Sequence, residues 1–198
     1  SIGEYSFQAC SNLASVIISD DVTTINSHAF HECSSLETII LPNYITFIGS
    51  LTFGSCSKLK TVKLPEKPTS ISSFMFNSCK KLKTIKIPDS VTSFGKYCFR
   101  SCNNLISIDM PDTVRTIGEY SFLDCSLLKD FHIPKSLTAI RKNTFRYCRS
   151  FTSITIPSNI VLIENQAFDF CENLNYVRFE GKNSPDFSGD IFSNTNLN

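Results

Sequence analysis

The side chains best suited to chemistry are three histidines and nine cysteines. His31 lies two positions before Cys33, and a thiol beside an imidazole is the arrangement of a nucleophilic pair. His28 precedes His31 by three positions, so these imidazoles with Glu32 or Cys33 also have the residue types of a metal site. The nucleophilic pair depends on what surrounds Cys33, whereas the spacing of the two histidines is better explained as a coincidence in a surface turn.

Cys33 belongs to a regular column, which argues against catalysis. Eight cysteines recur every 23 residues, each three positions after a phenylalanine of the same period. The phenylalanines are Phe7, Phe30, Phe53, Phe76, Phe99, Phe122, Phe145 and Phe168, and the cysteines are Cys10, Cys33, Cys56, Cys79, Cys102, Cys125, Cys148 and Cys171. Such placement is typical of a small apolar core residue. We expect no enzyme activity, no metal and no cofactor; P-loop, GxGxxG and CxxC motifs are also absent.

The repeat extends well beyond these two columns. A leucine follows each column cysteine by three positions, with Phe151 as the one substitute, and β-branched or other apolar residues close each unit. A fixed period of this length is typical of a solenoid, in which one unit buries too little and the stack forms the core. At about 4.8 Å per coil, eight coils would form a rod about 40 Å long.

Each unit predicts a short strand, a proline and a closing turn. In Leu36–Leu41, the alternation places Ile39 inward and Ile40 outward. The proline that usually follows ends the strand, because it cannot donate to a ladder. Phe-x-x-Cys-x-x-Leu has the spacing of one face of a short helical turn. Pro68 replaces an inward β-branched residue, so we expect an irregular coil there.

One copy of the unit, IPDSVTSFGKYCFRSCNNLISID from Ile87 to Asp109, shows the whole pattern. The consensus IPxxVxxIGxxAFxxCxxLxxI resembles the BspA-like subclass of leucine-rich repeats, found in surface proteins of bacteria and parasitic protists. The resemblance covers Ile2 to Phe179. It implies an α/β fold, namely a right-handed leucine-rich-repeat solenoid of about eight 23-residue coils with a parallel sheet on one face. It also implies adhesion to host or microbial proteins.

The whole sequence, residues 1–198, is predicted to form a single solenoid. Residues 179–198 are expected to make an imperfect last coil, because the pattern degrades after Phe179. The sequence starts inside a coil, so we expect it to be part of a longer protein. Stacked coils could bring column cysteines within disulfide Cα distance. Their regular placement instead favours reduced, buried thiols.

Charge is unevenly distributed although the net charge is only +1. Residues 1–54 contain no lysine or arginine, whereas the third and fourth coils are rich in lysine. The outward strand column is predicted to run Ile17, Ile40, Lys63, Lys86, Asp109, His132, Thr155 and Arg178. Solenoids use such regular faces for partners.

The predicted partner-binding residues lie on this face. They are Lys60, Lys63, Lys83, Lys86, Asp109 and His132. The four lysines would form a compact basic cluster. Either they extend into solvent and bind nothing, or they bind an anionic protein or glycan.

Other surfaces give weaker signals. A partly aromatic column, which includes Tyr97 and Tyr120, lies two residues before each column phenylalanine. It is either a packed ladder or an exposed strip for another chain. Nucleic acid is not expected as a partner, because the basic cluster is short and lacks interleaved aromatics. No apolar run is long enough to span a membrane.

Together these features predict a non-enzymatic protein-interaction module. We expect it to be the ligand-binding repeat region of a cell-surface or secreted adhesin. The alternative is an intracellular, cytoplasmic leucine-rich-repeat scaffold that recruits a signalling partner. Reduced cysteines fit the alternative more easily, and the absence of N-x-S/T sequons leans the same way.

Overall fold

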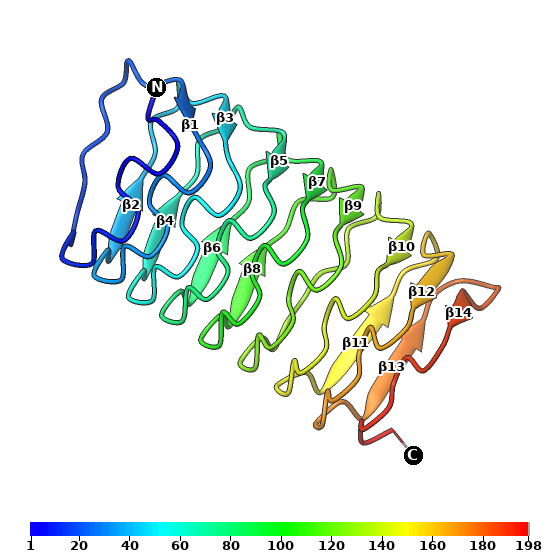
Figure 1. Cartoon of the computed structure of the whole chain (residues 1–198). Coiled ribbons are helices and arrows are strands. Elements are labelled where there is room, and N and C mark those ends of the chain that lie inside the picture. The colour runs from blue at the N-terminus through cyan, green and yellow to red at the C-terminus, as the bar shows by residue number, and fades with distance from the viewer. Residues whose placement is uncertain (198) are drawn as a thin grey trace.

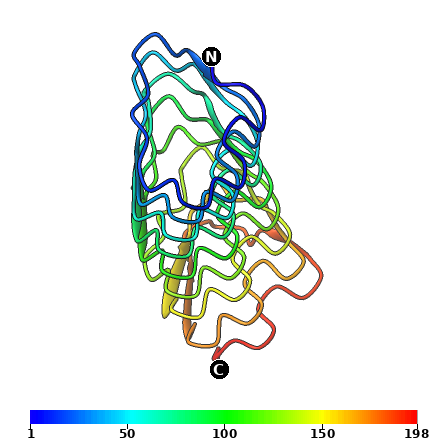
Figure 2. The ribbon, with the colours of Figure 1, turned by 60° about the vertical axis from the view of Figure 1, so that its left-hand side comes forward.

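The computed structural model describes residues 1–197 as a stack of coils that makes about seven turns. The stack is elongated, and each coil lies directly on the next (Figures 1 and 2). All strand pairing is parallel. The predicted parallel solenoid is therefore confirmed, whereas the predicted count of about eight coils is not.

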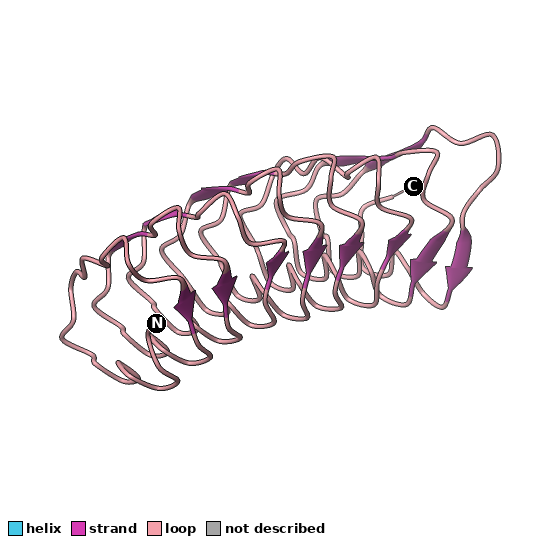
Figure 3. Ribbon diagram, turned by 90° about the horizontal axis from the view of Figure 1, so that it is seen from above, coloured by secondary structure: helices cyan, strands magenta, loops and turns pink. Residues whose placement is uncertain are grey.

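Two rows of strands run along opposite sides of the stack (Figure 3). The first strand face comprises β1 (Thr24–Ile25), β3 (Phe47–Ile48), β5 (Ser70–Ile71), β7 (Ser93–Phe94), β9 (Thr116–Ile117), β10 (Ala139–Ile140), β12 (Leu162–Glu164) and β14 (Asp186–Ser188). The second strand face comprises β2 (Thr38–Ile40), β4 (Thr61–Lys63), β6 (Thr84–Lys86), β8 (Ser107–Asp109), β11 (Ser153–Ile156) and β13 (Tyr176–Phe179). Only the second face was predicted as a sheet.

The third side of each coil, which we call the turn face, contains no helix among residues 1–197. The predicted helical turn, and with it the α/β label, is wrong. In the coil around Phe30, His28 and Glu32 both have positive φ, at 60° and 62°. This alternation lets the N–H groups of His28, Phe30 and Glu32 donate to carbonyl groups of the next coil at 2.8 to 3.0 Å. A helix would instead direct those N–H groups back into its own coil.

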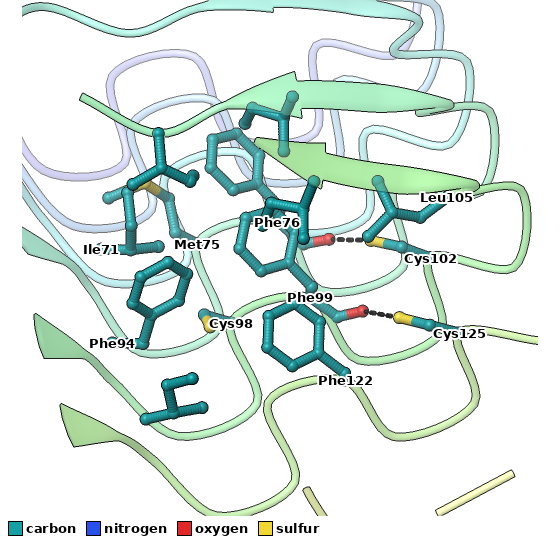
Figure 4. Packing of buried hydrophobic residues seen from close by; sticks show 14 of the residues in the cluster. Ile71, Met75, Phe76, Phe94, Cys98, Phe99, Cys102, Leu105, Phe122 and Cys125 are labelled. Carbon is teal, nitrogen blue, oxygen red and sulfur yellow. Dashed lines mark hydrogen bonds between the residues drawn. The ribbon is translucent and has the colours of Figure 1, made fainter. Parts of the chain in front are cut away.

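The core is a column of stacked phenylalanine rings flanked by thiols (Figure 4). Successive column rings lie 5.1 to 5.8 Å apart, from Phe7 to Phe168. From Cys33 onward, each column thiol donates to the carbonyl of the phenylalanine one coil earlier, at 3.1 to 3.3 Å. All nine cysteines are free, and eight of them are buried as predicted, whereas Cys10 is exposed.

Strand pairing divides the stack into three blocks. One face pairs as β1-β3, β5-β7-β9 and β10-β12-β14, and the other as β2-β4, β6-β8 and β11-β13. We call the boundary between the β3/β4 coil and the β5/β6 coil junction 1. Junction 2 separates the coil of β9 from the coil of β10 and β11. Within residues 1–197, strands pair across neither junction on either face.

Both junctions have a visible cause in the sequence. In six coils the residue at the Pro68 position donates its N–H to the carbonyl three residues earlier. Pro68 has no N–H, so its coil bends without this turn, and the predicted irregularity is confirmed. At junction 2, Phe131 replaces a β-branched residue. Its ring packs edge-on between Phe122 and Phe145, at 5.0 and 4.7 Å.

The last coil is longer than the others by one residue but continues the stack. β14 pairs with β12, Ile191 is buried, and Phe192 stacks on Phe168 at 5.3 Å. Asn198, the end of the predicted solenoid, lies outside the described residues. Residues 1–197 contain no helix that is long and apolar enough to cross a membrane.

Candidate partner-binding surface

The structure places all six predicted binding residues on exposed positions of the second strand face or just beyond its strands. β4 ends at Lys63, β6 at Lys86 and β8 at Asp109. These strands present their middle residue to the core and their end residues to solvent, as the alternation predicts. Lys60 and Lys83 directly precede β4 and β6.

Only one of the four lysines has a carboxylate partner among the described residues. Lys60 Nζ lies 2.8 Å from Glu37 Oε2, one coil earlier. The hydrogen bond from Lys60, and then its charge, lower the pKa of the Glu37 carboxyl. Lys86 is in register with Asp109, but no ion pair joins them. Lys63 is in register with Ile40, so its charge has no neighbour of opposite sign there.

His132 belongs to a different group. Its Nε2 lies 2.8 Å from Asp112 Oδ1, which also accepts the backbone N–H of Lys135 at 3.0 Å. That N–H, followed by the hydrogen bond with His132, lowers the pKa of the Asp112 carboxyl. His132 lines a hollow of about 380 Å³ with Phe131 and other residues of its own neighbourhood. It is exposed but separate from the lysines.

The catalytic and metal alternatives for Cys33 find no support in the geometry. The Cys33 thiol donates to the Phe7 carbonyl at 3.1 Å, and burial raises its pKa to about 11. Such a thiol carries almost no thiolate near neutral pH. His31 Nδ1 lies 2.9 Å from the Gly54 carbonyl, which can only accept, so Nδ1 carries the proton. Among residues 1–197, no group of three or more His, Cys, Asp or Glu side chains is placed to hold a metal ion.

The aromatic column on the turn face forms packed ladders. Phe74, Tyr97 and Tyr120 stack at 4.7 and 4.6 Å, and Tyr5 stacks on His28 at 4.7 Å. Tyr97 and Tyr120 are only partly exposed. The ladder interpretation is therefore the better of the two.

A second ladder on the turn face was missed. Tyr147 stacks on Phe170 at 4.7 Å, and the guanidinium groups of Arg146 and Arg149 lie 4.8 and 5.1 Å from the Tyr147 ring centroid. Tyr147, Arg149 and Arg100 are among the residues that line a shallow hollow of about 320 Å³. The 23-residue spacing of Tyr147 and Phe170 was the available signal.

Comparison with known proteins gives a consistent family. A family model described as the BspA type leucine rich repeat region, in six copies, matches residues 1–106 and 92–198. No curated protein matches the sequence significantly.

Three solved structures are similar to this chain. A leucine-rich repeat protein from Bacteroides ovatus has a TM-score of 0.81 and 29% identity, over 89% of this chain and 46% of that one. A leucine rich repeat protein from T. pallidum has a TM-score of 0.65 and 26% identity, over 85% and 67%. A leucine rich cell surface protein from Faecalibacterium prausnitzii has a TM-score of 0.53 and 25% identity, over 91% and 69%.

This chain therefore spans about half the length of the Bacteroides ovatus protein. The family model, by contrast, covers the sequence from its first residue to its last. The chain belongs to the BspA type leucine-rich repeat family.

Proposed function

We propose that this chain is a non-enzymatic module that binds an acidic protein surface through the second strand face over β4 and β6. The observation that carries the proposal is the set of four exposed lysines there, only one of which has a carboxylate partner among residues 1–197. A regular face on which most charges of one sign have no ion-pair partner favours a binding partner of the opposite sign. Asp109 and His132 lie further along the same face, and we place them at the margin of the contact.

We further propose that the parent protein is an adhesin at the cell surface. The family supports this, as does the similar Faecalibacterium prausnitzii protein, which is described as a cell surface protein. The free cysteines are weak support for an intracellular scaffold, because most of them are protected from oxidation by burial. Eight of the nine are buried, and a buried thiol with a raised pKa is a poor nucleophile in any compartment. Immunolabelling of intact cells that express the full-length parent distinguishes the two locations.

The binding test reverses the four lysines. In the variant with Lys60, Lys63, Lys83 and Lys86 all changed to Glu, binding to a synthetic polyglutamate peptide should be lost. The matched control changes Arg115, Lys142, Arg178 and Lys182 to Glu, which alters the net charge equally at exposed sites away from the cluster. Equal affinity of both variants would contradict the proposal. Binding of a sulfated oligosaccharide in place of the peptide would identify a glycan partner instead.

A further inference from the structure

The four lysines flank junction 1, where the stack lacks strand pairing. Lys60 and Lys63 lie on the β4 side, and Lys83 and Lys86 lie on the β6 side, in the same two repeat columns. Within residues 1–197, β4 pairs only with β2, and β6 pairs only with β8. The basic cluster therefore straddles a gap in the hydrogen-bonded ladder.

Two backbone amides identify this gap. At paired coil boundaries on this face, Leu41 N–H donates to Lys63 O at 3.0 Å, and Ile106 N–H donates to Lys83 O at 2.8 Å. The equivalent donors at junction 1 are Leu64 and Lys83. In the described chain, neither makes the corresponding bond across the junction. Leu64 is buried, and a buried N–H group without an acceptor destabilises the fold. Closing the ladder would give the Leu64 N–H an acceptor.

Electrostatics also oppose closure at this junction. Elsewhere, residues one repeat apart form ion pairs of opposite sign, such as Lys60 with Glu37 and Arg141 with Glu164. An ion pair between Lys135 and Asp112 crosses junction 2, at 3.7 Å. No ion pair in residues 1–197 crosses junction 1. Instead, lysine faces lysine in both columns.

The turn face continues unbroken across the same boundary. Leu51, Phe53 and Ser55 donate their N–H groups to the next coil at 2.7 to 3.0 Å. Cys79 Sγ also donates to Phe53 O at 3.2 Å. Junction 1 is thus hydrogen-bonded along the turn face and bridged on the first strand face by a side-chain bond from Ser72 Oγ to Ile48 O. Only the second strand face has no described hydrogen bond across the junction, so the junction can act as a hinge that opens on that face.

We propose that an acidic protein segment bound between the two lysine pairs acts as a clamp that closes junction 1. This inference rests on the proposed function of the lysine cluster. A carboxylate bound between the lysines of β4 and β6 attracts both, and these attractions outweigh the repulsion between the lysines. β4 and β6 can then form the missing backbone hydrogen bonds. Binding at the second strand face would in this way join the β1–β4 block to the β5–β9 block.

The decisive measurement is residue-resolved hydrogen exchange of the 198-residue chain with and without a polyglutamate peptide. The bound peptide should slow exchange of the Leu64 and Lys83 amides by about fivefold. Ile133 and Thr152, the equivalent positions at junction 2, serve as internal controls and should not change. A polyglutamine peptide of the same length should have no effect.

The outcomes separate this inference from the proposed function. If the peptide binds through the four lysines but Leu64 and Lys83 exchange at an unchanged rate, the clamp is overturned and the binding face stands. If the peptide does not bind, both fail.

A variant tests the electrostatic step without any ligand. Lys63→Glu places an acid opposite Lys86 in the neighbouring coil, as Glu37 lies opposite Lys60. It should slow exchange of Leu64 and Lys83 in the free protein by a similar factor. Lys129→Glu makes the same charge change on an exposed residue outside junction 1 and should leave these amides unaffected. Equal exchange in the two variants would overturn the clamp.

Discussion

The buried thiols predict a steep loss of stability in mild alkali. Burial is the first cause that raises the pKa of eight cysteines, to about 11 for Cys33 and about 12 for Cys56, Cys98 and Cys171. The pKa values of Cys79, Cys102, Cys125 and Cys148 are also raised. In the unfolded chain these thiols should ionise near the ordinary value of 9.0.

The sign follows from which state releases protons first. Above pH 9 the unfolded chain loses thiol protons that the folded chain keeps, so rising pH favours unfolding. The stabilisation is complete below pH 9 and is lost as the pH rises through the folded-state values. One pH unit above 9, each thiol contributes about 1 kcal/mol of destabilisation, and eight contribute on the order of 10 kcal/mol. That is comparable with the whole stability of a typical domain.

Urea unfolding followed by circular dichroism, at several pH values from 8 to 10 and with reductant present, measures this loss. The midpoint should fall steeply above pH 9. Changing Cys79 and Cys125 to Ser should reduce the pH slope by about a quarter, whatever its effect on stability at pH 8. Cys10 is exposed, so Cys10→Ser should leave the slope unchanged. A midpoint that is constant from pH 8 to 10 would refute the reasoning.

Two further predictions concern the turn face and the Asp112 group. Ser78 has a φ of 61°, so Ser78→Gly should relieve about 1–2 kcal/mol of backbone strain. Glycine also makes the unfolded chain more flexible, which offsets about 0.5–1 kcal/mol of this gain. The midpoint of thermal unfolding should therefore rise, whereas Ser35→Gly, at a residue without positive φ, should lower it; equal losses would contradict the assignment of strain. The pKa of the Asp112 carboxyl is lowered from 3.8, so the ionised carboxylate stabilises the folded state above about pH 3.8. This stabilisation is lost as the pH falls through the pKa of the folded state. The stability gap between wild type and Asp112→Asn, measured by urea unfolding, should be constant above about pH 5 and shrink as the pH falls below 3.8. A gap that does not shrink below pH 3.8 would count against this assignment.

The inward columns were predictable because each makes the same contact in every coil. Phe99, Cys102 and Leu105 are fully buried, as the 23-residue period requires. The turn face was not predictable, because its alternating positive φ values fall on residues such as Leu51 and Tyr97. Such residues rarely adopt that conformation on their own. Here, inter-coil hydrogen bonds impose it.

The sequence correctly predicted which residues of the candidate site are exposed, but not which of them form ion pairs. The outward alternation placed Lys63 and Lys86 correctly on one face. The ion pair between Lys60 and Glu37 could have been predicted, because the two residues are one repeat apart. The pairing of His132 with Asp112 depends instead on the path of the loop after β8, which no column describes.

The hydrogen bonds of the turn face have a common direction along the stack. On the strand faces, N–H groups donate both forward and backward: Ile2 donates to Thr24 of the next coil, and Asn26 donates back to Ile2. On the turn face, every inter-coil N–H donates toward the C-terminal end. Peptide dipoles aligned in this way add instead of cancelling. The turn face should therefore carry an axial dipole that is positive at its C-terminal end, where the exposed Asp190 lies in the last coil.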